Sequence, residues 1–434
     1  MRASLTLPTA LALALVGLTA CTSQEPGATP STKPSSPTAS PPAPSASPTP
    51  SAAPGKPASF HVVRTLDSTS APSATDQQRT RLYTTKNTTS NGKESGVLAL
   101  TANGSTITSV SARATVTDGK IHLAEEQIGV TNTRASFTPF PQASGKKCAR
   151  SPRQTAAATE REGTVVWSET ASTNLYNLDW CVFAYNPASK STVLLGDSAA
   201  VSNRIPPPAG GYAVAAGTKR AYWETAYPLT DAETTPISSK IMTNTLDGRA
   251  GLTTAADKAK LPRVLGDDLY YVRSNDVDAA FAPNRFEIRK RDAAGRDTQV
   301  VSGPLVHKDQ ILSTLSVSAG HISWVISGPT QSSLLHILDV KTNTAVTIKL
   351  GHVGPPTMSL NSTDTLVAWG NGSASGDPGE YVYDLATGKL WKLGSQGGHS
   401  SILAKGKYIA WARIEGSGPD GRAVYNVAEW KWLR

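Results

Sequence analysis

The chain has 434 residues, with 42 Lys and Arg against 33 Asp and Glu, a formal charge of +9 and a charged fraction of 17%. Its apolar fraction of 38% and aromatic fraction of 6% exclude a wholly disordered chain. The basic excess is small and scattered, so composition does not favour nucleic acid as a partner. The length allows two or three compact domains or one large repetitive domain.

Residues 1–20 have the pattern of an export signal. Arg2 precedes an apolar run from Leu5 to Leu18, which is shorter than the ~20 residues that cross a bilayer as a helix. The run ends in Leu18-Thr19-Ala20-Cys21, which resembles a bacterial lipobox. The resemblance implies that Cys21 becomes the acylated N-terminus, and two acyl chains, at ~0.8 kcal/mol per buried methylene, hold a protein on a membrane. An ordinary signal peptide with a nearby cysteine is the alternative.

The next segment, 21–58, contains the cysteine and a tether. Between Thr22 and Ala58, 11 of 37 residues are Pro, 13 are Ser or Thr and none is aromatic. Such a composition does not bury enough apolar surface to fold. We therefore expect an exported head domain, 59–434, anchored through Cys21 to the outer face of the cell membrane or to the periplasmic side of an envelope membrane.

The two remaining cysteines are Cys148 and Cys181. Outside the cytoplasm an even number of cysteines favours a disulfide, which here would contribute about 3 to 4 kcal/mol by closing a loop of roughly 34 residues. Two separate thiols or a metal pair are the alternatives, but neither cysteine has a His or Cys at ligand spacing.

A repeat is visible in the head as apolar runs with a central aromatic residue. The spacings between these markers are 56, 48, 53, 45 and 42 residues. In the last three repeats a turn beginning with Asp or Asn follows the marker after 15 residues. Short runs of alternating Val, Ile, Thr, Tyr and Trp indicate strands rather than helices. Each marker is interpreted as lying on the first, inner strand of its unit, and the markers are Trp167, Trp223, Tyr271, Trp324, Trp369 and Trp411.

The best-formed unit is Tyr-Val-Tyr-Asp-Leu-Ala-Thr-Gly-Lys at 381–389, with related turns at Asp339, Asp292 and Asn186. An Asp or Asn side chain bonds the turn backbone, and a later Gly or Asn tolerates positive φ. A period of ~40 to 50 residues with about four strands per unit is typical of a β-propeller. The unit resembles the TolB-type or WD40-like repeats of bacterial envelope propellers.

We therefore predict an all-β head: a β-propeller of about seven four-stranded antiparallel blades, with six or eight as alternatives. Lys120–Gln127 is interpreted as the inner strand of a seventh unit, and Arg81–Val116 as possible material for an eighth. The C-terminal strand, Tyr425–Leu433, leaves the last blade short of a strand. Phe60–Leu66 is predicted to supply it and so to cover an open sheet edge.

The sequence contains no Gly-x-Ser-x-Gly elbow, His-Glu-x-x-His pair, P-loop or EF-hand loop. Its seven histidines include no pair at the spacing of a metal site. We expect no catalytic residue, no cofactor and no metal, although the chain's status as an enzyme stays open.

One rim of the predicted ring is expected to be acidic. Loops assigned to the connection between first and second strands hold eleven acidic and two basic residues. The opposite rim, assigned the other turns and the connections between blades, collects basic residues such as Lys146, Lys147, Arg150, Arg153, Arg204, Lys219, Arg296, Lys405 and Lys407. The candidate binding rim comprises Glu169, Tyr176, Asp179, Trp180, Glu224, Tyr227, Asp231, Asp276, Asp278, Phe281, Asp377, Glu415 and Asp420.

These features favour a non-catalytic binding or scaffolding module that meets the membrane through its lipid and binds an envelope protein partner or wall glycan, but no nucleic acid. The alternative is a carbohydrate-active or cofactor-dependent envelope enzyme with its site in the central channel, because propellers host both classes. Paired carboxylates near the channel would favour the enzyme.

Overall fold

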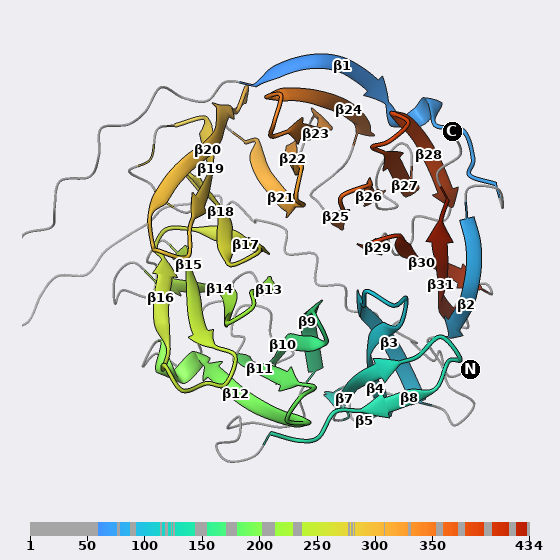
Figure 1. Ribbon diagram of the computed structural model, residues 1–434, viewed down its shortest axis with the longest axis vertical. Helices are drawn as coiled ribbons and strands as arrows, with labels where there is room; N and C mark the ends of the chain where they lie inside the picture. Colours follow the sequence, from blue (N-terminus) through green and yellow to red (C-terminus); the bar gives the residue numbers. More distant parts are fainter. Residues whose placement is uncertain are drawn as a thin grey trace, which may run out of the picture.

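The computed structural model describes residues 60–75, 79–86, 93–112, 115–117, 120–122, 124, 126–143, 154–170, 180–201, 213–228, 237–276, 278, 281, 283–307, 309–328, 331–352, 359–371, 378–394, 402–415 and 422–431. Seven antiparallel sheets stand around a central axis as the blades of a β-propeller (Figure 1). The predicted fold class and blade number are therefore confirmed.

The blades follow one another along the chain, and each begins with its innermost strand. Blade I contains β3 (Lys93–Leu100), β4 (Thr106–Ala112), β7 (Glu126–Thr131) and β8 (Phe137–Pro139); blade II contains β9 (Gln154–Arg161), β10 (Thr164–Thr170), β11 (Trp180–Asn186) and β12 (Ser191–Asp197); blade III contains β13 (Val214–Ala216), β14 (Arg220–Pro228), β15 (Ile237–Thr245) and β16 (Thr253–Ala256).

Blade IV contains β17 (Lys260–Leu265), β18 (Asp268–Ser274), β19 (Arg285–Arg291) and β20 (Asp297–Pro304); blade V contains β21 (Ile311–Val317), β22 (His321–Gly328), β23 (Gln331–Asp339) and β24 (Thr344–His352). Blade VI contains β25 (Leu360–Ser362), β26 (Leu366–Asn371), β27 (Gly379–Asp384) and β28 (Lys389–Gly394); blade VII contains β29 (Ile402–Lys405), β30 (Tyr408–Glu415), β31 (Arg422–Trp430) and β2 (Arg79–Lys86). Two short 3-10 turns, η1 (Ser68–Ser70) and η2 (Ser198–Ala200), follow β1 (His61–Asp67) and β12.

The apolar core lies between neighbouring blades. Strand β18 shows why: Leu269 and Tyr271 pack in a cluster with blade III, whereas Val272 packs with blade V. Successive side chains of a strand point to opposite faces, so each blade buries both of its faces. The first strands contact one another in turn around the ring, which closes between β29 and β3.

The aromatic markers lie on the second strand of each blade, not on the first as predicted. Trp223, Trp324 and Trp369 are at most 1% exposed. Each marker faces the preceding blade, as Trp324 does where its ring centroid lies 6.1 Å from that of Phe286. The markers were placed one strand too early because a buried inner strand and a buried second strand have the same apolar pattern.

The predicted turn chemistry is present between the third and fourth strands of blades V and VI, but Asn426, the residue 15 positions after Trp411, lies within β31 and begins no turn. Asp384 Oδ1 accepts from the backbone amides of Ala386 and Thr387, both at 3.0 Å, and Gly388 has a φ of +65°. Asp339 Oδ1 caps the corresponding turn of blade V. These repeated turns were recognisable because the bonds that form them are local.

Ring closure differs from the prediction, because Phe60–Leu66 does not complete the last blade. Strand β1 instead pairs parallel with β24 as a fifth strand of blade V. The chain then crosses blade VI, where Lys392 exchanges backbone bonds with Pro72 and Ala74. Strand β2 pairs antiparallel with β31 and closes blade VII. The N-terminal segment thus runs outside three consecutive blades (Figure 1).

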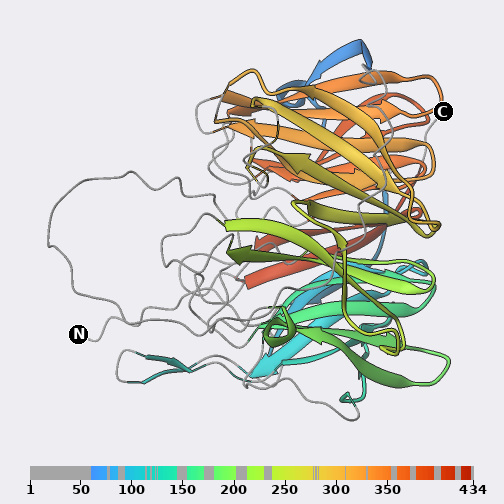
Figure 2. The same cartoon turned by 90° about the vertical axis from the view of Figure 1, so that its left-hand side faces the viewer.

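Lys120–Gln127 is not an inner strand. Its first residues form β6 (Lys120–His122), which pairs with β5 (Thr115–Thr117) in a hairpin inserted between β4 and β7. This hairpin projects from the ring (Figure 2). Arg81–Val116 contributes strands to blades VII and I and to this hairpin rather than to an eighth blade. The repeat period was predicted correctly, but the inserted hairpin was mistaken for the first strand of a blade.

Candidate functional site

The loops predicted to form the binding rim join second and third strands, not first and second strands. In an antiparallel four-stranded blade this rim also carries the connections between blades, because the chain reverses direction at every strand. Lys258, between β16 and β17, accordingly reaches the loop after β18, where its Nζ lies 3.0 Å from Asp278 Oδ1. The predicted grouping of the connections with the opposite rim is therefore wrong.

Much of the candidate rim stays a prediction. Tyr176, Asp179, Asp231, Asp377 and Asp420 lie outside the described residues, and only the backbone is described for Tyr227 and Glu415. Of the expected basic residues, Lys146, Lys147, Arg150, Arg153 and Arg204 also lie outside them. Lys219, Arg296 and Lys407 lie in or beside turns that join first to second or third to fourth strands.

The structure brings several candidate residues together at the seam between blades III and IV. Glu224, in β14, is buried, and its Oε2 accepts from the backbone amide of Leu261 at 2.8 Å. Asp276, after β18, forms an ion pair with Lys260 and accepts from the Ser274 hydroxyl. Both acids contact residues of β17, so they tie the inner strand of blade IV to its neighbours.

Asp278 is the most deeply buried of these acids, with a side chain 1% exposed. It lies between Lys258 Nζ and Arg273 Nη2, the latter 2.7 Å from Oδ2. The Arg273 guanidinium also lies over the Phe281 ring, 5.4 Å from its centroid. We call Lys258, Arg273, Asp276, Asp278 and Phe281 the seam cluster. Its accessible part is cationic and aromatic because the chain's own cations cover the predicted acids.

The electrostatics of Asp276 favour fixed charge rather than proton transfer, and those of Glu224 differ. Burial tends to raise the pKa of Asp276, but the Lys260 ammonium and the Ser274 hydroxyl outweigh it and leave that pKa lowered. Burial raises the pKa of Glu224, against the opposing effects of the Leu261 amide and Lys260. Because Asp276 remains a carboxylate at neutral pH, the seam cluster is suited to binding.

Two other candidate residues have structural contacts on the seams of blade II. Trp180 is buried, donates from Nε1 to Thr225 Oγ1 at 3.0 Å and packs on Trp223. Glu169 Oε1 accepts from Trp167 Nε1 at 2.8 Å. Glu169 also lies near Glu126, whose pKa is raised by burial and, to a smaller extent, by the Glu169 charge.

Sequence reasoning did not single out Glu380, the second residue of the wholly buried strand β27. Glu380 is 1% exposed, and its Oε1 has no hydrogen-bond partner among the described residues. Burial raises the pKa of Glu380 to about 8, against the opposing effects of its own backbone amide and of Lys392. Gly394 faces it and has room for no Cβ, which would lie 2.7 Å from Glu380 Oε2. In the sequence, the available signal for a buried carboxyl was the pairing of a glutamate in a predicted strand with a glycine in the next one, Glu380 with Gly394.

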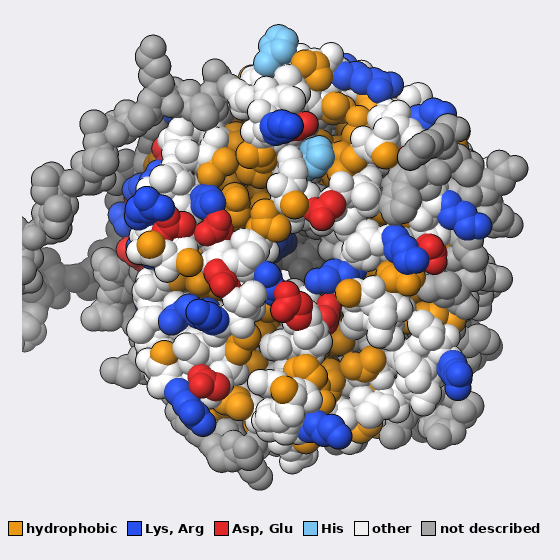
Figure 3. Space-filling view, in the orientation of Figure 1, with side chains coloured by type: hydrophobic (Ala, Val, Ile, Leu, Met, Phe, Trp, Pro, Cys, Tyr) orange, Lys and Arg blue, Asp and Glu red, His pale blue; other side chains and the backbone are white. Residues whose placement is uncertain are grey.

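Bonds that skip a blade cross the ring near its axis. Lys405, of blade VII, donates to the Glu160 carbonyl of blade II at 2.7 Å, and Arg161 donates to the Gly266 carbonyl of blade IV. Basic and acidic side chains are intermixed around the central hollow on the face seen in Figure 3. The described part of that face therefore carries no single sign of charge.

The predicted cofactor-free, metal-free character remains untested. Within the described ranges, no three His, Cys, Asp or Glu side chains are grouped as metal ligands, and no helix is long and apolar enough to cross a membrane. Cys181 is buried in β11, whereas Cys148 and Cys21 lie outside the described residues. The disulfide and the lipid anchor therefore stay predictions.

Comparison with known proteins gives distant similarities to solved structures. No family model and no curated protein matches the sequence. Among solved structures, the chain is similar to puromycin hydrolase, with 12% identity and a TM-score of 0.42 over 87% of this chain and 62% of that one. A chain of the mitotic checkpoint complex gives 10% identity and a TM-score of 0.43 over 84% and 97%.

A puromycin-hydrolyzing peptidase of Mycobacterium tuberculosis is similar at 14% identity, with a TM-score of 0.36 over 83% of this chain and 61% of that one. The chain thus spans about three fifths of the length of these hydrolases. The class that the fold defines is the seven-bladed β-propeller. At these identities the neighbours' activities do not transfer to it.

Proposed function

We propose that this protein is a non-catalytic binding module of the cell envelope, held at the membrane by a lipid on Cys21, and that a protein partner docks on the seam cluster. The observation that carries the proposal is the arrangement of Arg273 between Asp278 and Phe281. Arginine and aromatic side chains dominate binding energy at protein interfaces. Here a buried carboxylate holds the arginine in place before any partner arrives.

The fixed charges of the cluster support binding over catalysis. A general acid or base works best when its pKa lies near the working pH, whereas the pKa of Asp276 is lowered away from neutrality. Lys258 and Arg273 are each 39% exposed in their side chains, so a partner's carboxylates can reach them.

The docking proposal is tested by capture of envelope proteins with the full-length protein after mild crosslinking. Phe281→Ala should lose the specific partner that the wild type captures. Arg249→Gln is the matched control, because Arg249 lies in an exposed turn between β15 and β16, away from the cluster. Equal capture by the Phe281→Ala and wild-type proteins would sink the docking site. Separately, Cys21→Ser should move the protein from the membrane to the soluble fraction.

A second function, a carbohydrate-active enzyme, is supported by the approach of Glu126 and Glu169 at the seam between blades I and II. One carboxyl with a raised pKa beside a second carboxylate is the pairing that glycoside hydrolysis uses. Both groups already bond to this chain, Glu126 to the Thr155 amide at 2.7 Å and Glu169 to Trp167. If this function holds, the protein cleaves chromogenic glycosides and Glu126→Gln abolishes the cleavage. Hydrolysis by the wild-type protein at the rate seen in buffer alone would rule this function out.

A further inference from the structure

A cleft of about 550 Å³ opens along the outer part of the seam between blades III and IV. Blade III contributes small side chains there, Ala255 and Ala256 of β16, and blade IV contributes long polar ones from three strands. This volume lies within the range of small-molecule sites. The cleft is lined by Thr254, Ala255, Ala256, Asp257, Lys258, Tyr271, Arg273, Arg289, Arg291 and Asp297.

Tyr271 explains why this seam is polar. It is the one marker of the six that is not tryptophan, and its hydroxyl donates to Asp297 Oδ2. Burial and the Asp297 carboxylate raise the Tyr271 pKa, so the phenol stays protonated and remains a donor. The hydroxyl thus fixes a carboxylate at this seam, whereas the marker of the seam between blades V and VI, Trp369, stacks on Tyr381.

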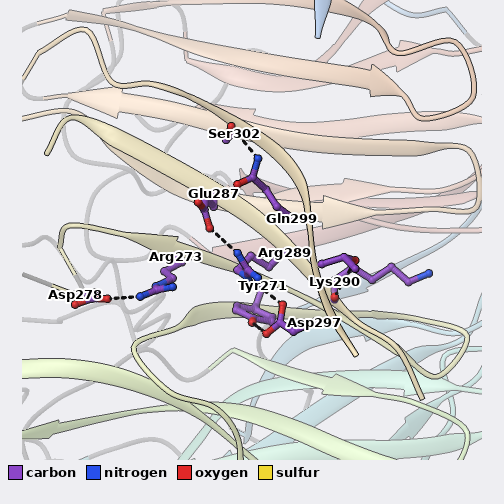
Figure 4. Close-up of polar contacts among 10 residues, drawn as sticks. Tyr271, Arg273, Asp278, Glu287, Arg289, Lys290, Asp297, Gln299 and Ser302 are labelled. Atoms are coloured by element: carbon purple, nitrogen blue, oxygen red, sulfur yellow. Dashed lines mark hydrogen bonds and ion pairs between the residues drawn. The ribbon is translucent and has the colours of Figure 1, made fainter. Parts of the chain in front are cut away.

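Arg289 is held on two sides within this wall (Figure 4). Its Nε donates to Asp297 Oδ1 at 2.9 Å and its Nη1 donates to Glu287 Oε2 at 2.8 Å. Bonds to Glu287 and Asp297 raise its pKa against the effect of burial, so the guanidinium is permanently charged. Its Nη2 has no hydrogen-bond partner among the described residues, which leaves one edge of a fixed cation available.

Of the four cations in the cleft lining, Arg291 has the weakest hydrogen bonding to the described protein. It lies two residues along β19 from Arg289, on the same face, opposite Asp297 of β20. Its described bond is a long one, from Nε to the Gly295 carbonyl at 3.4 Å. Its two Nη groups therefore have no protein acceptor in the described chain, although the side chain is half-buried beside the cleft.

The cleft thus has more donors than acceptors. Its lining holds four cationic side chains against two carboxylates, and the two oxygens of Asp297 are already occupied by Tyr271 and Arg289. Glu287 and Asp278 orient Arg289 and Arg273 from outside the lining. Guanidinium groups fixed in this way match the paired oxygens of a phosphate or carboxylate.

We propose that the cleft between blades III and IV binds the oxyanion group, phosphate or carboxylate, of a ligand of small-molecule size or of a repeating unit of an anionic polymer. Arg291 and Arg289 would donate to the oxyanion, and Tyr271 with Asp297 would hold Arg289 in place. The cleft shares Lys258 and Arg273 with the seam cluster, but the two oxyanion donors, Arg289 and Arg291, lie outside that cluster. Substitution of Arg291 therefore tests the cleft separately from the docking surface.

The test measures the thermal unfolding midpoint of the full-length protein in detergent against inorganic phosphate, with chloride at equal ionic strength as reference. A ligand of the native state raises the midpoint with its concentration. Arg291→Gln should need roughly tenfold more phosphate for the same rise, a loss of ~1.4 kcal/mol in binding. Arg249→Gln, the matched control, should behave as wild type.

Parallel titrations with glucose 1-phosphate, a poly(glycerol phosphate) oligomer and glucuronate distinguish the sources of the oxyanion. A preference for the oligomer assigns the cleft to an anionic polymer, and a preference for either small compound assigns it to a phosphate or carboxylate metabolite. The proposal would be overturned if the unfolding midpoints of Arg291→Gln and wild type rose equally with phosphate. It would also be overturned if none of the four probes raised the wild-type midpoint above its value in chloride.

Discussion

The seam between blades V and VI and the seam between blades III and IV occupy equivalent places in the ring but are filled differently. At the first, Trp369 stacks on Tyr381 and packs with Ile348, Leu350 and Leu360. At the second, Tyr271 meets two alanines and turns its hydroxyl to Asp297. The two seams thus differ in their marker and in the size of the opposing side chains, and the second holds a polar cleft within the same four-stranded blade architecture.

The largest expected effect comes from emptying the apolar seam. Trp369→Ala should lower the free energy of unfolding by about 3 to 5 kcal/mol, because a fully buried indole leaves a cavity that the neighbouring blades cannot fill. Denaturant titration of full-length protein gives the value. A loss below about 1 kcal/mol would mean that the seams do not carry the stability of the ring.

Glu380 tests whether a buried carboxyl on the opposite face of blade VI, toward blade VII, lowers stability. Its pKa is about 8 in the fold against a usual 4.5, so the folded state holds the proton more tightly and stability falls as pH rises from 4.5 to 8. Glu380→Gln should therefore stabilise the protein by roughly 2 to 4 kcal/mol at pH 8.5. At pH 4 it should change stability little. A gain independent of pH would contradict the assignment.

At the polar seam, Asp278→Asn should cost about 1 to 2 kcal/mol. The buried carboxylate balances Lys258 and Arg273, and its loss leaves these half-exposed cations facing each other. Because the cations reach solvent, added salt should recover part of the loss. Unfolding at low and high salt measures this, and an equal cost at both would argue against an electrostatic origin.

The smallest expected effect is that of Tyr271→Phe, about 1 kcal/mol. It removes one hydrogen bond from Asp297 but keeps the ring and leaves Arg289 Nε on the other oxygen. The same variant should weaken phosphate binding less than Arg291→Gln does. A cost near that of Trp369→Ala would show that the two seams depend on their marker residues in the same way.

Local chemistry allowed much of the fold to be predicted from the sequence. The turn at 384–388 forms through hydrogen bonds that span at most four residues. The strand around Trp369 was recognisable because that residue is fully buried and stands in an apolar run. The blade number follows from the period of such signals. The order of strands within a blade was misjudged, since nothing local separates a first strand from a second one.

Features that depend on distant pairing could not be predicted. Both β1 and β2 follow the segment predicted to be a tether, and only their partners β24 and β31 decide which of them closes the ring. Likewise, Asp276 and Asp278 were recognised as acidic, but their partners were not. Lys258 comes from a connection that was assigned to the other rim, and Lys260 begins β17. These ion pairs form only when distant strands pack together, so composition alone does not predict them.

The path of the N-terminal segment has a mechanical consequence. A pull applied to the chain before Phe60 first loads β1, which is bonded to β24 and held by Arg64 on the Gly388 carbonyl at 2.9 Å. The bonds between Lys392 and residues Pro72 and Ala74 come next along the chain. Tension that enters from residues before Phe60 therefore acts on β1, the fifth strand of blade V, before it reaches β2 and β31. The pairing that closes the ring is thus the last of these contacts to be loaded.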